Sequence, residues 1–157
     1  KLLLALGEAA SGAQLIGGQV EDMLAEKNPA VTADQLRSIH LKKTAAMITA
    51  SLVMGGTVAE ATPAQIEVLA QAGERLRLAF QIIDDILDAT ADTATLGKTA
   101  GKDAKADKTT YVKLHGIDKS REYARRYTDE ALAGIRSLPG DTSFLLALID
   151  SMASRVR

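Results

Sequence analysis

Residues 79–89 read Ala-Phe-Gln-Ile-Ile-Asp-Asp-Ile-Leu-Asp-Ala, and three carboxylates interrupt a segment that is otherwise apolar on nearly every side. A helix that is apolar all round is normally buried. Asp84 and Asp88 are four residues apart and share a helix face, whereas Asp85 lies about 100° away. Like charges at that spacing repel, and burying an unpaired carboxylate is costly, so the pattern predicts a compensating cation. Mg²⁺ suits this position because it prefers oxygen ligands and often bridges to substrate phosphates. The alternative interpretation is an acidic face turned to solvent or a cluster at a helix end.

The composition sets broad limits on the class of protein. The chain has 157 residues, which fits one domain over residues 1–157, and its 19 Lys and Arg balance 20 Asp and Glu, so the overall charge does not indicate nucleic acid or a membrane as partner. The absence of Cys excludes a disulfide scaffold and suits a reducing compartment, and we expect a cytoplasmic protein. No segment approaches the roughly 18 apolar residues of a membrane span, and the short apolar run before Glu8 is not a signal peptide.

The local patterns predict an all-α protein. Ala and Leu are abundant, aromatic residues make up 3% of the chain, and no stretch alternates with the period of two typical of strands. Capping residues, Pro and Gly predict helices over residues 2–25, 32–54 (ended by Gly55-Gly56), 62–89, 119–137 and 141–155. The segment 90–108 is predicted to be a loop, and loops of this length are often functional.

A basic loop follows the Asp cluster. Gly97-Lys98 comes shortly after Asp88, and Lys108 precedes Thr109-Thr110-Tyr111. Ammonium groups beside a carboxylate-bound metal suit a diphosphate ligand, because the metal bridges some phosphate oxygens and the lysines neutralise the rest. A solvated basic loop is the alternative, and we keep it for Lys102 and Lys105.

Two weaker signals lie upstream. Lys43 and Thr44 come just before an apolar segment, where a lysine side chain can also simply extend to the surface, and His40 is more typical of a surface or capping residue than of a catalyst. Gln19 and Asp22 follow Gly17-Gly18 and are three residues apart, so they are predicted to share a helix face. Glycines inside a helix cost about 1 kcal/mol each relative to Ala, which indicates close packing.

Together the patterns GGQxxD, IHxxKT, FQxxDDxLD and GKxxGxDxxxxKTTY form a specific set over residues 17–157. This set resembles the C-terminal half of the short-chain trans-polyprenyl (isoprenyl) diphosphate synthases of the farnesyl and geranylgeranyl type. The resemblance implies an all-α barrel of antiparallel helices, here an incomplete half. It also implies condensation of an allylic diphosphate with isopentenyl diphosphate, release of pyrophosphate, Mg²⁺ as cofactor and a homodimer.

The resemblance also implies a role for each matching residue. The metal ligands would be Asp84 (the principal one), Asp85 and Asp88, directly or through water. The residues holding the allylic diphosphate would be Lys43, Lys98 and Lys108. Oxygens beside the allylic carbon would come from Thr44 and Gln81, and Phe80 would border the isopentenyl side. Gln19 and Asp22 would support Lys43 and the metal network.

One departure from the family pattern is large. A first aspartate-rich motif, its Arg pair and an upstream Gly-Lys-x-x-Arg element do not occur in these residues. We therefore expect this chain alone to be inactive and to expose an apolar wall that requires a partner. The chain would be a truncation or proteolytic product, one part of a split enzyme that pairs with a separate N-terminal half, or a degenerate homologue that regulates a synthase.

Two further interpretations stay open. A class I terpene cyclase shares helices and an Asp cluster, but it is not expected to combine them with the GK and KTTY elements. A purely structural, catalytically incomplete helical subunit predicts that Asp84→Ala leaves every ligand interaction unchanged.

Overall fold

The computed structural model describes residues 1–25, 28, 30, 32, 35, 45–90 and 110–154, and every regular element among them is a helix. This confirms the all-α prediction. The helices are α1 (Leu2–Ala9), α2 (Leu15–Ala25), α4 (Ala45–Val58), α5 (Pro63–Thr90), α8 (Tyr111–His115), α9 (Ile117–Arg136) and α10 (Ser143–Ala153). In the part of the chain that is described, no helix is long and apolar enough to cross a membrane.

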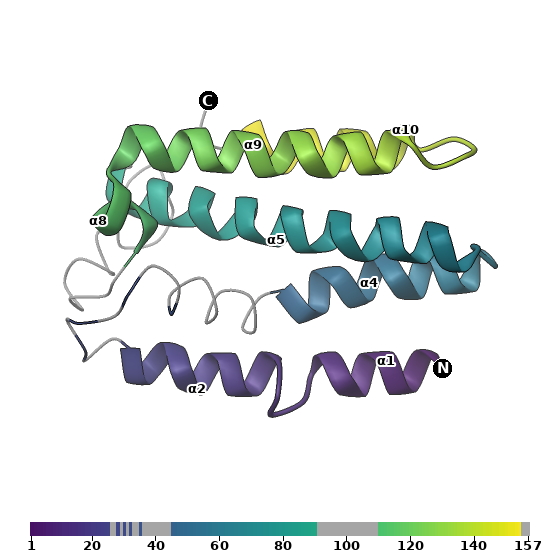
Figure 1. The fold of residues 1–157 in the computed structure, drawn as a ribbon, viewed down its shortest axis with the longest axis horizontal. Coiled ribbons are helices and arrows are strands. Elements are labelled where there is room, and N and C mark those ends of the chain that lie inside the picture. Colours follow the sequence, from purple (N-terminus) through teal and green to yellow (C-terminus); the bar gives the residue numbers. More distant parts are fainter. Residues whose placement is uncertain are drawn as a thin grey trace.

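Helix α5 lies at the centre of the arrangement. It packs against α9 on one side and α4 on the other, and α10 lies beside α9 (Figure 1). Helices α1 and α2 follow one another along a single line and contact α4. The short α8 contacts both α5 and α9 near the end of α5 that carries the Asp cluster.

The start of α5 has the local signals that the sequence predicts. Pro63 occupies the first helical position, and Thr62 and Gln65 form reciprocal hydrogen bonds: Gln65 N donates to Thr62 Oγ1 (3.4 Å) and Thr62 N donates to Gln65 Oε1 (2.7 Å). A similar pair joins Thr32 and Gln35, where Gln35 N donates to Thr32 Oγ1 at 3.2 Å. The predicted start at Thr32 therefore has its capping hydrogen bonds, while residues 36–44 lie outside the described residues.

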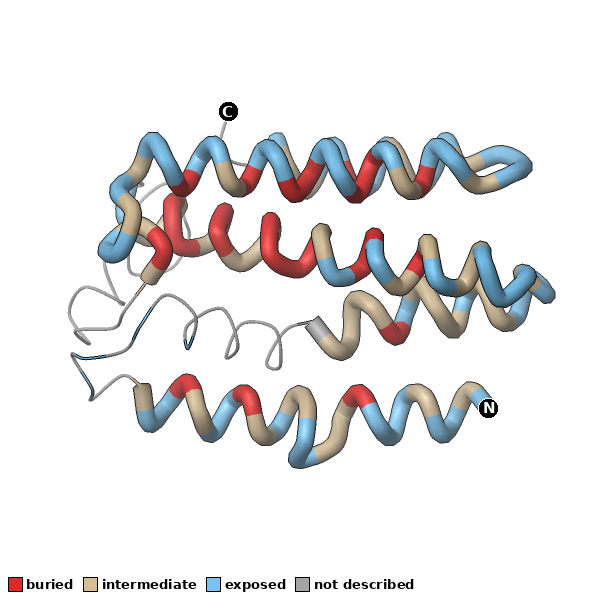
Figure 2. The backbone as a smooth tube through the Cα atoms, in the orientation of Figure 1, coloured by how far each residue is buried: buried red, intermediate tan, exposed pale blue. Residues whose placement is uncertain are grey.

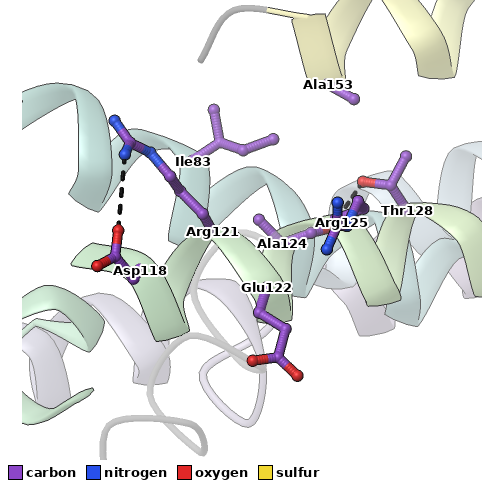
Figure 3. A pocket seen from close by; sticks show the side chains of 8 residues that line it. All are labelled: Ile83, Asp118, Arg121, Glu122, Ala124, Arg125, Thr128 and Ala153. Atoms are coloured by element: carbon purple, nitrogen blue, oxygen red, sulfur yellow. Dashed lines mark hydrogen bonds and ion pairs between the residues drawn. The ribbon is translucent and has the colours of Figure 1, made fainter. Parts of the chain in front are cut away.

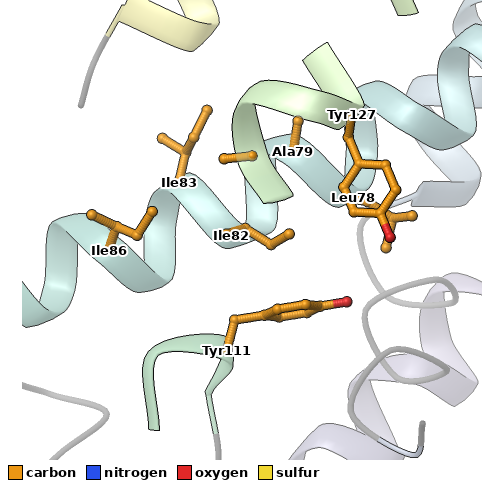
Figure 4. Close-up of a cluster of buried hydrophobic side chains, with 8 residues drawn as sticks. Leu78, Ala79, Ile82, Ile83, Ile86, Tyr111 and Tyr127 are labelled. Carbon is orange, nitrogen blue, oxygen red and sulfur yellow. The ribbon is translucent and has the colours of Figure 1, made fainter. Parts of the chain in front are cut away.

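The core consists of two apolar clusters along α5. One includes Leu78, Ile82 and Ile86 with Tyr111 of α8, and Figure 4 shows the Tyr111 ring beside this side of α5. The other joins Leu69 and Leu76 to α9 and α10 through Leu132, Ile135 and Ile149. Buried residues therefore concentrate on α5 and on the facing side of α9 (Figure 2). Each large apolar side chain in these clusters contributes about 1.5–3 kcal/mol by its removal from water.

The predicted end of the second helix at Gly55-Gly56 is wrong, because α4 continues to Val58. Gly56 does not end the helix but allows α4 to pack against α5. A Cβ at this position would collide with Leu69 Cδ1 and lie 3.0 Å from Ile66 Cδ1, both on α5. The glycine thus lets α4 and α5 approach closely. The turn that follows includes Glu60, which has φ of 56°.

The predicted single helix over residues 2–25 is also wrong in its middle. A turn at residues 10–14 separates α1 from α2, and Ser11 Oγ accepts a hydrogen bond from Ala13 N at 3.3 Å. Ser side chains compete for backbone groups in this way and favour turns over helix interiors. Gly17 allows the turn to lie against the first residues of α2, because a Cβ at this position would collide with the carbonyl oxygen of Gly12.

The remaining boundaries agree with the prediction to within a few residues. Helix α9 begins at Ile117 and ends at Arg136, and α10 runs from Ser143 to Ala153. Helix α8 is not among the helices predicted from the sequence. Residues 91–109, most of the predicted loop, and residues 155–157 lie outside the described residues.

Candidate functional site

The C-terminal half of α5 carries the acidic side chains that the sequence singles out. Asp84 and Asp88 are half-buried, as are Phe80 and Gln81, whereas Asp85 is only 3% exposed. The three carboxylates therefore do not share one environment. The two that are four residues apart lie on one face of α5, and the third is turned into the protein.

Asp85 connects α5 to α8. Its Oδ2 accepts a hydrogen bond from the backbone N of Tyr111 at 2.9 Å, and its Oδ1 accepts one from Gln81 Nε2 at 3.2 Å. Tyr111 N is one of the N-terminal amides of α8 that lack a partner within the helix, and Thr110 Oγ1 accepts from another, Lys113 N, at 3.1 Å. Asp85 thus fixes the start of α8, and its predicted role at a metal stays a prediction.

Ring contacts hold α8 against α9. The His115 ring lies 5.6 Å from the Tyr111 ring and 5.3 Å from the Tyr123 ring, measured between centroids. The Arg126 guanidinium stacks over Tyr123 and Tyr127 at 5.1 and 5.0 Å, and the side-chain hydrogen bond with Tyr127 raises the pKa of Arg126. These ring contacts help to hold α8 in place between α9 and the end of α5 that carries the three Asp residues.

Gln19 and Asp22 on α2 differ in burial. Asp22 is 2% exposed, whereas Gln19 is exposed to solvent. A spacing of three residues puts them about 60° apart around the axis of α2, so Asp22 lies on the inner side of this face and Gln19 on its outer side. The supporting role predicted for them stays a prediction.

Several predicted site residues lie outside the described part of the chain. These are Lys43, Thr44, Lys98 and Lys108. His40, Lys102 and Lys105, which the sequence analysis interprets as surface residues, also lie outside the described part. Their neighbours in sequence are described: α4 begins at Ala45, directly after Thr44, and Thr110 lies two residues after Lys108.

The described residues include two candidate metal ligands. Among them, no group of three or more His, Asp or Glu side chains is gathered so as to hold an ion. Asp84 and Asp88 nevertheless form a pair of carboxylates on one face of a central helix. This donor set fits Mg²⁺, which is commonly held by one or two carboxylates and completes its shell with water and substrate phosphates.

Arg77 is a buried cation on α5 that the sequence patterns did not indicate. It is 5% exposed, and it precedes Asp84 by seven residues, which is two helical turns on the same face. Together with Glu74 it lines a cavity of about 250 Å³ between α1, α4 and α5.

A second hollow, of about 440 Å³, lies at the surface between α9 and the end of α10 (Figure 3). Its rim includes Arg121 and Asp118, which form an ion pair at 3.8 Å and are both exposed. Ile83 lies against it from α5, on a face well away from Asp84. The hollow is therefore separate from the acidic face.

Comparison with known proteins decides the family. The polyprenyl synthetase family matches residues 3–142. The chain belongs to this family. It is 44% identical over 161 residues to the chloroplastic geranylfarnesyl diphosphate synthase of Leucosceptrum canum, an alignment that covers 99% of this chain and 44% of that protein. It is 41% identical over 161 residues to the chloroplastic heterodimeric geranylgeranyl pyrophosphate synthase large subunit 1 of Arabidopsis thaliana, covering 99% of this chain and 43% of that protein.

The solved structures of the polyprenyl synthetase family share the fold. The geranyltransferase of Helicobacter pylori complexed with magnesium and isoprenyl diphosphate superposes with a TM-score of 0.80 at 29% identity, over 98% of this chain and 50% of that one. The heptaprenyl diphosphate synthase of Staphylococcus aureus gives a TM-score of 0.90 at 22% identity, over 99% of this chain and 60% of that one, which shows the fold alone. The chain spans less than half the length of the curated relatives it matches.

Proposed function

We propose that this polyprenyl synthetase chain takes part in joining an allylic diphosphate to isopentenyl diphosphate. In this reaction the allylic C–O bond breaks, the allylic carbon bonds to C4 of isopentenyl diphosphate, a proton leaves C2, and pyrophosphate is released. The observation that carries the proposal is the pair Asp84 and Asp88 on one face of the central helix of a family member.

Asp84 is the proposed principal ligand of Mg²⁺, and Asp88 is the second. A magnesium ion bound there would supply electrostatic stabilisation of the leaving diphosphate. Asp85 already accepts two hydrogen bonds within the chain, so its proposed part is contact through water and the positioning of α8. Lys43, Lys98 and Lys108 are proposed to neutralise the phosphate oxygens that face away from the carboxylates.

The allylic carbon needs surroundings that stabilise developing positive charge and exclude water. We assign Gln81 and Thr44 to the first task, through their oxygens, and Phe80 to the apolar wall on the isopentenyl side. Gln81 is held in place by its hydrogen bond to Asp85. Asp22, buried on α2, and Gln19 are proposed to support Lys43. Pyrophosphate itself takes the final proton in this proposal, so the site needs no separate general base.

The outer side of α1 and α2 supports pairing with another chain. Seven large apolar side chains there are exposed: Leu3, Leu4, Leu6, Ile16, Val20, Met23 and Leu24. Helices α1 and α2, which carry these side chains, lie along one side of the molecule (Figure 2). Stretches of exposed apolar surface of this kind mark interaction sites, and we propose a homodimer or a complex with a separate N-terminal half. Sedimentation of a monomeric species only, in the protein with its native termini, would contradict this proposal.

For the compartment we propose the cytoplasm, because a chain with no Cys suits reducing surroundings. The two curated relatives above are named chloroplastic. Imaging of the protein tagged in its own gene tests this proposal, and a plastid signal would overturn it.

The condensation is tested by the incorporation of labelled isopentenyl diphosphate in the presence of Mg²⁺, with the protein in its native context. We expect Asp84→Ala and Lys98→Ala each to lower turnover by two orders of magnitude or more, since each removes stabilisation of the leaving group. Asp129→Ala, which removes an exposed carboxylate on α9, is the matched control and should leave turnover unchanged. Near-normal turnover in the Asp84 variant would refute the assignment.

A further inference from the structure

Both carboxylate oxygens of Asp85 accept hydrogen bonds, and the two donors come from different parts of the chain. Oδ2 accepts from the backbone N of Tyr111 on α8, and Oδ1 accepts from Nε2 of Gln81, one turn earlier on α5. Asp85 is 3% exposed and Gln81 is half-buried, so the pair lies largely away from water. Each contact therefore has a direction that is set by which atoms donate and which accept.

The carboxylate of Asp85 determines how the amide of Gln81 is turned. An ionised carboxylate has acceptors only, whereas an amide has an NH₂ donor on one side and a carbonyl oxygen on the other. Gln81 therefore bonds to Asp85 through Nε2 and not through Oε1. As a result, Oε1 lies on the side of the amide that faces away from Asp85.

The position of Gln81 on α5 determines what lies on that other side. At about 100° per residue, Asp85 is about 40° from Gln81 around the helix axis. In the opposite direction, Asp88 is about 20° and Asp84 about 60° away. Gln81 therefore stands between the buried Asp85 and the half-buried Asp84–Asp88 face. An amide that turns its NH₂ toward Asp85 turns its oxygen toward this face.

We propose that Asp85 is a positioning residue that makes Gln81 present Oε1, and not its NH₂ group, to the substrate at the Asp84–Asp88 face. This inference rests on the proposed prenyltransferase function, in which an oxygen of Gln81 stabilises the positive charge that develops on the allylic carbon. A carbonyl oxygen carries partial negative charge and favours such a carbon, whereas an NH₂ group in the same place disfavours it. Asp85 acts through Gln81 and does not itself contact the allylic carbon.

The substitution Asp85→Asn reverses the orientation of Gln81 without changing the size of the side chain at position 85. The backbone N of Tyr111 only donates, so it takes the single oxygen of the new amide, and the new NH₂ group then faces Gln81. Gln81 accepts from this group through Oε1, which turns its own NH₂ toward the Asp84–Asp88 face. With Mg²⁺ and both substrates at saturation, and the protein in its native context, we expect kcat to fall by about 10–100-fold.

The double variant that combines Asp85→Asn with Gln81→Glu separates this role from metal binding. The carboxylate at position 81 accepts from the NH₂ at position 85 and presents its second oxygen to the Asp84–Asp88 face, while Tyr111 N keeps its acceptor. The exchange preserves both hydrogen bonds and the net charge, so it does not depend on the folding of the single variant. We expect kcat within about tenfold of the wild-type value and well above that of Asp85→Asn alone. A kcat of the double variant as low as that of Asp85→Asn would overturn the proposal, because a carboxylate needed at position 85 for the metal gives that result.

A second pair on α5 supplies the matched control. Gln71 Nε2 donates to Glu67 Oε1 at 2.8 Å, with the same donor, the same kind of acceptor and the same four-residue spacing, but at exposed positions. Glu67→Gln should leave kcat unchanged, and a loss equal to that in Asp85→Asn would contradict the proposal. An unchanged kcat in Asp85→Asn would overturn the role of Asp85 while leaving the prenyltransferase function intact. Absence of condensation by the wild-type protein would refute the proposed function itself.

Discussion

Replacement of Asp85 by Ala tests how α8 is held at the acidic end of α5. The substitution removes the acceptor of the Tyr111 N–H bond (2.9 Å) and the acceptor of the Gln81 Nε2 bond (3.2 Å). Asp85 is 3% exposed, so water does not readily replace either bond. Among the described hydrogen bonds to side chains, the start of α8 then keeps that of Lys113 N to the Thr110 cap.

The loss of stability follows from these two bonds. A hydrogen bond to a charged group contributes about 1.5–3 kcal/mol, and a buried N–H left without an acceptor costs about 1–3 kcal/mol. We expect the free energy of unfolding to fall by about 3 kcal/mol for Asp85→Ala, which is a large share of the typical total of about 5–15 kcal/mol. In a domain of this size that loss lowers Tm by about 6–12 °C. Asp85→Asn keeps one oxygen acceptor for Tyr111 N and should lose about 1 kcal/mol.

Urea unfolding followed by circular dichroism measures these differences, and hydrogen exchange localises them. The amides of α8 should lose protection in Asp85→Ala before those of α9 do. Asp129→Ala, at an exposed position on α9, should stay within about 0.5 kcal/mol of the wild-type protein. A stability for Asp85→Ala equal to that of this control would refute the anchoring role.

Three further substitutions test the packing of α4 on α5 and the pKa shift of Asp141. Gly73→Ala should destabilise the protein by about 1–3 kcal/mol, because the new Cβ would lie 2.7 Å from Thr49 Cα. Gly55 has open space around it, so Gly55→Ala should be neutral or stabilise the protein by up to about 1 kcal/mol. Equal Tm values for the two variants would contradict the packing of α4 on α5. The side-chain and backbone hydrogen bonds from Ser143 lower the pKa of Asp141 below its ordinary 3.8. The ionised Asp141 therefore contributes to stability above pH 3.8, and this contribution is lost as the pH falls through the pKa of the folded state. Asp141→Ala should therefore lower Tm at neutral pH and have no effect in strong acid, and an effect that is the same at both pH values would exclude this cause.

The sequence patterns predicted the elements whose signals are local. The start of α5 depends on Thr62, Pro63 and Gln65, which are adjacent in the chain, and the amphipathic spacing of α9 indicates its buried side without help from other elements. These helices were predicted to within about two residues.

The errors concern features that depend on distant residues. Gly56 reads locally as a helix end, but its lack of a side chain serves the contact with Leu69. Helix α8 has five residues, too few to be stable alone, and it is fixed by Asp85, which is 26 residues away in sequence. Arg77 reads locally as one more basic residue of a helix, and only the cavity between three helices gives it a specific place.

In the candidate site, too, features that depend on one helix were predicted and features that depend on contacts between helices were not. The spacing of Asp84 and Asp88 places them on one face, as expected, because helix geometry alone determines it. The structural use of Asp85 depends on α8 and was not predicted. The exposure of Gln19 depends on the side of α2 that faces α4, which the sequence of α2 does not specify.

The central claim is that the Asp84–Asp88 face of α5 holds a divalent cation together with the diphosphate. It is tested most directly by a crystal structure with Mn²⁺ and an unreactive thiolodiphosphate analogue of the allylic substrate, in which anomalous scattering locates the metal. The account predicts a metal peak at bonding distance from an Asp84 carboxylate oxygen, with the hydrogen bonds of Asp85 to Tyr111 and Gln81 intact. A bound analogue with its diphosphate away from this face, or a metal held without Asp84, would contradict it.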